Sequence, residues 1–109
     1  MTYKMFLDDE RFPAKDDCVI VRSSQEAIAL IEKEGMPIHI FFDHDLGGDD
    51  TSMVLIHWII DKVLDEELDV PYKFTYSIHS QNPIGVTNIN NLMNAFLWVT
   101  CKIKGARTS

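Results

Sequence analysis

The sequence predicts a single α/β domain with a mostly parallel four-stranded sheet, and three observations support this fold class. The run at residues 37–42 is apolar except for His39, which is typical of a central strand covered on both faces. Strand-like and helix-like patterns alternate along the rest of the chain. With 109 residues, of which 46% are hydrophobic, the chain can bury one compact core.

Two strands separated by a polar loop are expected at the start of the chain. The first strand covers residues 3–7 and is followed directly by Asp8 and Asp9. A polar loop at residues 10–17 then leads to a β-branched strand at residues 18–22. The loop is too short for a crossover helix, but in extended form it can span the length of a strand.

A helix is expected next, because Ser23 and Glu26 have the spacing of a capping box. Gly35 is well placed to end this helix in a left-handed C-cap, and Pro37 prevents the helix from continuing. The apolar run then supplies the third strand, at residues 38–42.

A second helix, a fourth strand and a third helix complete the expected domain. Either Asp50 or Thr51 caps the second helix, which carries a wide apolar stripe over residues 55–64. Residues 73–79 alternate between apolar and polar, as in a half-buried or edge strand. Apolar residues recur at helical spacing over residues 89–99.

We expect the domain to cover residues 1–104, followed by a flexible, basic tail at residues 105–109. No stretch approaches the roughly 20 apolar residues of a membrane span, and the N-terminus leads into a strand rather than a signal peptide. A cytoplasmic protein without membrane contact is therefore expected. The net charge of -7 and the pI near 4.8 argue against general electrostatic binding to DNA or RNA.

Right-handed crossovers and packing of helices on both faces favour a parallel sheet in which the strands are ordered second, first, third, fourth. The strand order then reverses between the first and third strands, and ligands of such sheets bind there, beyond the carboxyl ends. At that point Asp8 and Asp9 meet the polar segment at residues 43–45, while His79 and Ser80 end the neighbouring fourth strand.

Carboxylates that converge in one crevice repel one another unless a cation, a shared proton or a basic partner is present. Magnesium or manganese fits this need, because both prefer oxygen ligands and commonly meet a phosphate. The candidate metal ligands are Asp8, Asp9, Asp43 and Asp45. The alternative is that these aspartates cap helices and turns.

The same crevice holds candidates for proton transfer and for substrate binding. His44 and His79 could each transfer a proton near neutral pH or bind a phosphate oxygen, although a single histidine is often structural. Arg11 could hold a phosphate with its guanidinium or simply neutralise the acidic pair. Further candidates to contact a substrate are Ser80, Asn82 and Gly85. Asn and Gly are also ordinary turn residues.

Two common chemistries are disfavoured. Gly47 and Gly48 lack the continuation of a phosphate-binding loop, which argues against a nucleotide kinase. Ser80 has no G-x-S-x-G context, so a hydrolase elbow is not supported. Trp98, in the last helix, is the best hint of a homodimer.

Three short segments resemble the receiver domain of response regulators, a three-layer, flavodoxin-like α/β fold. These segments are Leu7-Asp8-Asp9, Phe42-Asp43 and His79-Ser80, and Asp43 matches the phospho-acceptor position. The chain departs from receivers because a loop replaces the first helix, and no fifth strand with the receiver's lysine follows the last helix. The resemblance implies the receiver fold rather than phosphorelay signalling.

The chain is more similar to the cyclic-phosphate processing receiver-like family, which is recognised by three ordered motifs. They read here Leu7-Asp8-Asp9-Glu10-Arg11-Phe12-Pro13, Asp43-His44-Asp45-Leu46-Gly47 and His79-Ser80-Gln81-Asn82-Pro83-Ile84-Gly85. The resemblance covers nearly the whole chain and extends to small phage-encoded proteins. By this resemblance the metal ligands are Asp8, Asp9 and Asp43, the acid and base are His44 and His79, and the phosphate-binding residues are Arg11 and Asn82.

The sequence therefore predicts a metal-dependent phosphoesterase that processes a cyclic phosphate, on a nucleotide or an RNA end, at the carboxyl ends of the strands. Mg²⁺ or Mn²⁺ is the expected cofactor. The alternative is a non-catalytic module that sequesters a nucleotide or a protein partner. Both readings stay open, because a site that binds phosphate and one that cleaves it use the same residue types.

Overall fold

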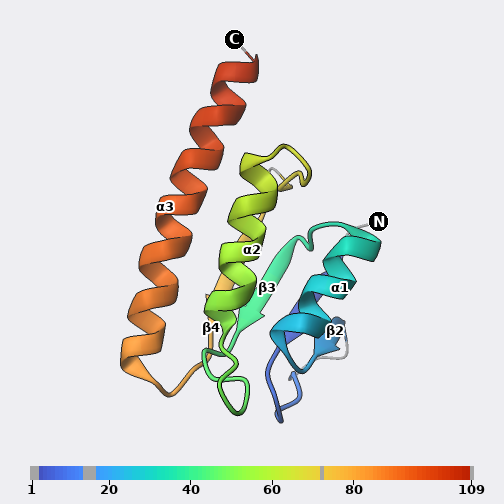
Figure 1. Ribbon diagram of the computed structural model, residues 1–109, viewed down its shortest axis with the longest axis vertical. Coiled ribbons are helices and arrows are strands. Elements are labelled where there is room, and N and C mark those ends of the chain that lie inside the picture. The colour runs from blue at the N-terminus through green and yellow to red at the C-terminus, as the bar shows by residue number, and fades with distance from the viewer. Residues whose placement is uncertain (1–2, 14–16, 72, 109) are drawn as a thin grey trace.

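The computed structural model describes residues 3–13, 17–71 and 73–108, which form a four-stranded sheet and three helices (Figure 1). The strands are β1 (Lys4–Leu7), β2 (Cys18–Val21), β3 (His39–Phe42) and β4 (Thr75–Ile78). The helices are α1 (Ser24–Glu34), α2 (Ser52–Leu64) and α3 (Pro83–Thr108). The expected element order is confirmed, and each strand lies within its expected range.

The described strands pair in parallel in the order β2-β1-β3-β4, which confirms the predicted topology. Leu7, the last residue of β1, is level with Val21 and with Phe42, and Phe42 is level with Ile78. The four strands therefore end together at one edge of the sheet. The order reverses between β1 and β3, where parallel α/β sheets bind their ligands.

The three described helices lie on one face of the sheet, with α2 packed between α1 and α3 (Figure 1). The crossovers from β2 to β3 and from β3 to β4 run in the same direction across the sheet, so right-handed connections put both helices on one face. The connection from β1 to β2 runs the other way, but its described residues form no helix. The described chain thus has one sheet layer and one helix layer, which differs from the expected three-layer arrangement.

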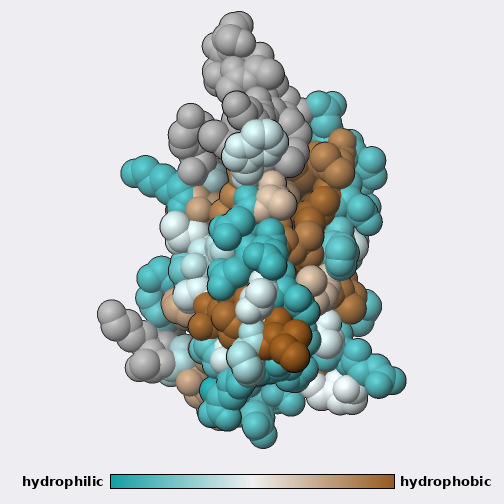
Figure 2. Space-filling model, turned by 90° about the vertical axis from the view of Figure 1, so that its left-hand side faces the viewer, coloured by the Kyte–Doolittle hydropathy of each residue, from teal (hydrophilic) through white to brown (hydrophobic). Residues whose placement is uncertain are grey.

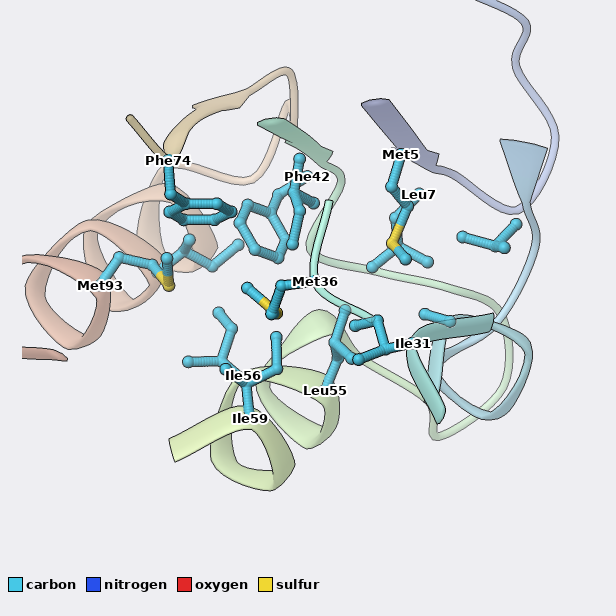
Figure 3. Close-up of a cluster of buried hydrophobic side chains, with 14 of the residues drawn as sticks. Met5, Leu7, Ile31, Met36, Phe42, Leu55, Ile56, Ile59, Phe74 and Met93 are labelled. Carbon is cyan, nitrogen blue, oxygen red and sulfur yellow. The ribbon is translucent and has the colours of Figure 1, made fainter. Parts of the chain in front are cut away.

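The hydrophobic core fills the space between the sheet and the helices (Figure 3). Alternate strand residues point toward the helices, and those on β1 and β3 are fully buried. They are Met5, Leu7, Ile40 and Phe42. The helices contribute buried side chains at helical spacing, namely Ile31, Leu55, Ile56, Ile59, Ile89 and Met93.

The opposite face of the sheet, called the open face below, is covered by none of the described helices. Its residues are Lys4 and Phe6 of β1, Cys18 and Ile20 of β2, His39 and Phe41 of β3, and Thr75 and Ser77 of β4. The ring centroids of Phe6 and Phe41 lie 6.0 Å apart, and those of His39 and Phe41 lie 4.3 Å apart. A row of rings therefore crosses the open face from β1 to β3.

Local signals set the helix ends. Ser23 caps α1, because its Oγ accepts a hydrogen bond from the Glu26 amide at 3.1 Å, and Gly35 ends the helix with a φ of 84°. Helix α3 is longer than expected, since the predicted tail at residues 105–109 is helical as far as Thr108. The division of the chain at residue 104 stays a prediction.

The side of the molecule formed by α2 and α3 exposes an apolar groove (Figure 2). Its lining residues are Ile60, Val63, Leu64, Leu92, Ala95, Phe96 and Thr100. Trp98 on α3 is 65% exposed, and the homodimer that it suggested stays a prediction. Among the helices described, none combines the length and the apolar character that crossing a membrane requires.

Candidate functional site

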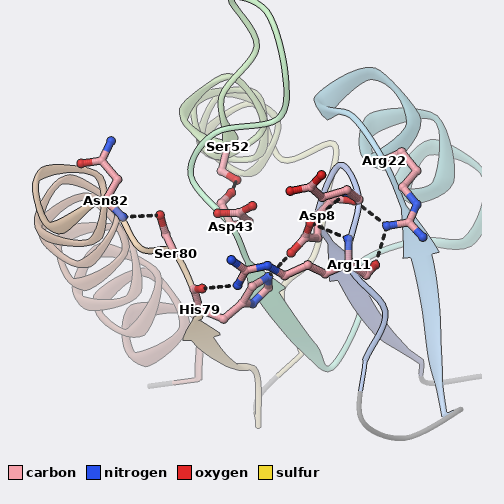
Figure 4. A network of polar contacts seen from close by, with 9 residues as sticks. Asp8, Arg11, Arg22, Asp43, Ser52, His79, Ser80 and Asn82 are labelled. Carbon is pink, nitrogen blue, oxygen red and sulfur yellow. Dashed lines mark hydrogen bonds and ion pairs between the residues drawn. The ribbon is translucent and has the colours of Figure 1, made fainter.

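The ends of β1, β3 and β4 bring together Asp8, Asp43 and His79, called the Asp8 cluster below (Figure 4). One ligand atom from each of the three side chains lies within 4.8 Å of the other two. Asp8 and Asp43 directly follow neighbouring strands, and His79 directly follows the next one. The predicted convergence of remote acidic segments and a histidine at one edge is therefore present in the structure.

Asp8 is fully buried and is held by three hydrogen bonds. Its Oδ1 accepts from the amides of Glu10 at 3.0 Å and Arg11 at 2.9 Å, and its Oδ2 accepts from Nε2 of His79 at 3.0 Å. Burial alone raises the pKa of Asp8, but these hydrogen bonds outweigh burial and hold the pKa below its usual range. The surroundings of Asp8 therefore favour the ionised form of its carboxylate.

Asp43 has the opposite electrostatic character. Burial raises its pKa, and the negative charge of Asp8 raises it further, with a smaller contribution from Asp9. The backbone carbonyl of Asp43 accepts a hydrogen bond from the hydroxyl of Ser52, the first residue of α2. This bond ties the acidic strand end to the start of a helix, so Asp43 is fixed beside a carboxylate that disfavours its ionisation.

The His79 ring is held from two sides. It stacks on the ring of Phe6 with centroids 4.8 Å apart and an interplanar angle of 5°. Because Asp8 accepts from Nε2, that nitrogen carries the proton, and Nδ1 is a buried nitrogen without a hydrogen-bond partner among the described residues. The ring thus orients the Asp8 carboxylate through Nε2.

Two arginines border the Asp8 cluster (Figure 4). Arg22 Nη1 donates to the backbone carbonyls of Asp8 and Arg11, and its guanidinium lies 4.7 Å from the ring centroid of Phe12. Arg11 Nη1 donates to the carbonyl of His79 at 3.5 Å. Arg22 therefore braces the loop after β1, whereas the exposed Arg11 side chain extends from that loop toward the end of β4.

A second group, called the His44 cluster, comprises His44, Asp45, Asn82 and Gly85. His44 Nδ1 lies 2.9 Å from Asp45 Oδ1, and Asn82 Nδ2 donates to Asp45 Oδ2 at 3.4 Å. These two hydrogen bonds lower the pKa of Asp45. A Cβ atom on Gly85 would lie 2.7 Å from Cβ of His44, so only glycine lets α3 approach this ring.

Asn82 and Ser80 also shape the turn into α3. Asn82 Oδ1 accepts from the amides of Ile84 and Gly85 at 3.1 Å each, which is the pattern of a helix N-cap. The Asn82 amide in turn donates to Ser80 Oγ at 3.1 Å. The structure thus gives both predicted substrate-binding residues contacts within the turn, and their contact with a substrate stays a prediction.

The donor set of the Asp8 cluster could hold a divalent cation. Magnesium prefers carboxylate oxygens, which Asp8 and Asp43 supply, while His79 bonds to Asp8 in the manner of a residue that orients a ligand. Asp9 is exposed but close enough for its charge to act on Asp43. Asp45 belongs to the His44 cluster and lies outside the three-residue group. Metal binding stays a prediction.

A parallel sheet ordered β2-β1-β3-β4, with an acidic pair after β1 and an aspartate after β3, defines a receiver-like α/β domain. Residues 3–95 match the family of cyclic-phosphate processing receiver domains, so the chain belongs to that family. This match confirms the resemblance seen in the three motifs. Neither a curated protein nor a solved structure matches the chain.

Three contributors to the site were missed by sequence reasoning: Arg22, Ser52 and Asp50. Arg22 follows β2 directly, so its place at a strand end could have marked it. Ser52 bonds to the carbonyl of Asp43 and gave no signal beyond starting a helix. Either Asp50 or Thr51 was expected to cap α2; Thr51 takes the N-cap position, and Asp50 instead accepts from the backbone amide of Ser24 at 2.9 Å, at the start of α1.

Proposed function

We propose that this protein hydrolyses a cyclic phosphate diester at the Asp8 cluster, with a divalent cation as cofactor. The family to which the chain belongs is named for cyclic-phosphate processing. The observation that carries the proposal is the placement of Asp8, Asp43 and His79 within 4.8 Å at the ligand-binding edge of the sheet. A packed carboxylate pair of this kind suits a cation and a phosphate better than an apolar ligand.

Asp8 and Asp43 would hold the cation, and His79 keeps the Asp8 carboxylate in place through its 3.0 Å hydrogen bond. When bound, Mg²⁺ or Mn²⁺ supplies charge stabilisation for the phosphoryl oxygens. The guanidinium of Arg11 extends over the same edge and would bind a phosphoryl oxygen. Its present contact with the carbonyl of His79, at 3.5 Å, is long and is readily exchanged for an anion.

His44 would transfer the proton. Its Nδ1 is paired with Asp45, so Nε2 is the ring nitrogen that can exchange a proton with the substrate. In hydrolysis a water oxygen forms a bond to phosphorus, one ester oxygen of the ring leaves, and the proton of the water passes to His44 and then to that oxygen. The product is a phosphate monoester with a free hydroxyl, and no oxidant or second substrate is needed.

A panel of 2′,3′- and 3′,5′-cyclic nucleotides tests this proposal. Each would be incubated with the protein and Mg²⁺ or Mn²⁺, following both consumption and stoichiometric binding. We expect consumption of at least one cyclic isomer, with kcat reduced 10²-fold or more in His44→Ala, the order typical of general acid–base catalysis. The exposed His57→Ala on α2 is the matched control and should retain activity.

Recovery of every ligand unchanged would contradict hydrolysis. If a cyclic phosphate then binds in stoichiometric amount, the protein is a sequestering module of the kind that the sequence left open. If none binds, the crevice has a different ligand, and protein partners become the subject of the search.

A further inference from the structure

A pocket on the open face adjoins the Asp8 cluster, and its aromatic walls have no role in the chemistry described above. It has a volume of about 470 Å³, within the range typical of sites for small organic ligands. This pocket is called the Phe12 pocket below. The residues that line it include Phe6, Phe12, Phe41, Arg11, His79 and Lys4.

The pocket is continuous with the proposed phosphate site, because Arg11 and His79 belong to both. His79 contributes Nε2 to the Asp8 cluster and lays its ring on Phe6, which is a wall of the pocket. A ligand whose phosphate contacts Arg11 would therefore place its organic part beside Phe6.

The walls of the pocket are mainly aromatic. Phe6 and Phe41 are neighbours across β1 and β3, and Phe12 belongs to the loop that follows β1. Phe12 is 75% exposed, an unusual setting for so large an apolar side chain. The guanidinium of Arg22 lies over its ring and helps to fix it, although no described residue buries it.

The far end of the pocket is polar. Lys4 starts β1, four residues before Asp8, and its Nζ lies 3.2 Å from Asp17 in an exposed ion pair. Four strand residues span roughly 13 Å, which is enough for a ribose and a base in series. One end of the pocket thus offers a cation and an acidic group that can hydrogen-bond to the edge of a heterocycle, and the other end meets the phosphate site.

We propose that the Phe12 pocket binds the nucleobase of the substrate, so that the cyclic phosphate is carried by a nucleotide or by the terminal nucleotide of an RNA. The inference rests on the proposed function for the placement of the phosphate. Stacking on aromatic side chains is tolerant of base identity, so the pocket favours substrates that carry a nucleobase without distinguishing among the bases.

Paired substrates with and without a base test this inference. Adenosine 2′,3′-cyclic phosphate would be compared with methyl riboside 2′,3′-cyclic phosphate, and the 3′,5′ isomers would be compared in the same way. The expected kcat/KM advantage of the base-bearing substrate is roughly 5- to 150-fold, the range for one stacked base. Phe12→Ala should remove most of this advantage and leave kcat/KM for the base-free substrate unchanged.

Two variants serve as controls. Phe12→Tyr keeps an aromatic ring and should retain the advantage of the base. Ile84→Ala removes a similarly exposed apolar side chain at the start of α3 and should leave kcat/KM unchanged for both substrates. An unchanged rate with the base-free substrate also shows that Phe12→Ala leaves the Asp8 cluster intact.

The failure of this inference differs from the failure of the proposed function. The nucleobase site would be wrong, and hydrolysis would still stand, if the wild-type protein had equal kcat/KM for both members of a pair. The same conclusion would follow if Phe12→Ala lowered kcat/KM equally for both members. If neither substrate is hydrolysed, binding of adenosine decides the question through the amide NMR signals of Phe6 and Phe41. Shifts that disappear in Phe12→Ala would support the pocket, and the absence of shifts in the wild-type protein would overturn it.

Discussion

Asp8 and Asp43 lie in one cluster but respond to it in opposite ways. Hydrogen bonds from two amides and His79 lower the pKa of Asp8, whereas burial and the charge of Asp8 raise the pKa of Asp43. Asp8 therefore stabilises the folded protein at pH values above the usual aspartate pKa, and this contribution is lost as the pH falls through its lowered value. The contribution of Asp43 is fully present below the usual value and is lost as the pH rises through its raised pKa.

Replacing each aspartate by asparagine should therefore change stability in opposite directions. In the absence of divalent cations at pH 7, Asp8→Asn should lower the melting temperature, because a charged acceptor of three hydrogen bonds is lost. Asp43→Asn should raise it, because a disfavoured charge is removed. Thermal unfolding monitored by circular dichroism in EDTA measures both changes, and both differences should shrink as the pH is lowered. If both substitutions shifted the melting temperature in the same direction at pH 7, the opposite electrostatic roles of Asp8 and Asp43 would be wrong.

Gly85 shows why one small residue fixes the position of a candidate catalytic side chain. A Cβ atom at this position would lie 2.8 Å from Cδ2 of His44, closer than real contacts allow. We expect Gly85→Ala to displace His44 and to lower kcat for a cyclic phosphate by 10²-fold or so, the cost of roughly 1 Å of misplacement. Thr87→Ala, at an exposed position in the same helical turn, is the control. Full activity in Gly85→Ala would show that the ring position is not critical.

At the scale of elements, helix caps join segments that are distant in sequence. Asp50 precedes α2, yet its carboxylate accepts hydrogen bonds from the backbone amide and the hydroxyl of Ser24 in α1. The start of α1 is thus fixed to the loop between β3 and α2, which carries His44 and Asp45.

Asp50→Ala should lower the free energy of unfolding by about 0.5–2 kcal/mol, the usual cost of losing a helix cap. Urea unfolding followed by circular dichroism measures this loss, with the exposed neighbour Asp49→Ala as the matched control. Equal stability of the two variants would mean that the contact with Ser24 contributes nothing to folding.

The elements themselves were predictable because their signals are local. The Ser23 cap, Gly35 and the apolar run before Phe42 each act through neighbouring residues, and each appears in the structure as expected. The partner of Asp50 was not predictable, since Asp50 could cap the helix that follows it and its contact with Ser24 depends on how two loops meet in space. The same holds for Arg22, whose role comes from the fold of the loop after β1.

At the scale of the whole molecule, the strand order does most to create the site. Right-handed crossovers favour that order, so the meeting of Asp8, Asp43 and His79 could be inferred from the sequence. The separation of Asp45 into the His44 cluster could not, because it depends on side-chain directions within one short loop.

The arrangement of one sheet layer and one helix layer also follows from the right-handedness of the crossovers. Of the connections between strands, only the one from β1 to β2 runs in the direction that would place a helix over the open face. The described residues of that connection form a loop. The sheet therefore keeps a row of rings on its open face, and the Phe12 pocket lies between these rings and the loop. In the described part of the chain, the space that such a helix would occupy beside the acidic edge holds this pocket instead.

Hydrolysis of a cyclic phosphate at the Asp8 cluster, with the help of a divalent cation, is the function that we propose for this protein. The most direct test follows one cyclic phosphate by ³¹P NMR with the wild-type protein, with Asp43→Asn and with Asp69→Asn, an exposed aspartate outside the site. We predict conversion to a monoester by the wild-type protein and Asp69→Asn with Mg²⁺ or Mn²⁺, and none in EDTA or with folded Asp43→Asn. Equal conversion in EDTA, or by Asp43→Asn at the wild-type rate, would contradict the claim.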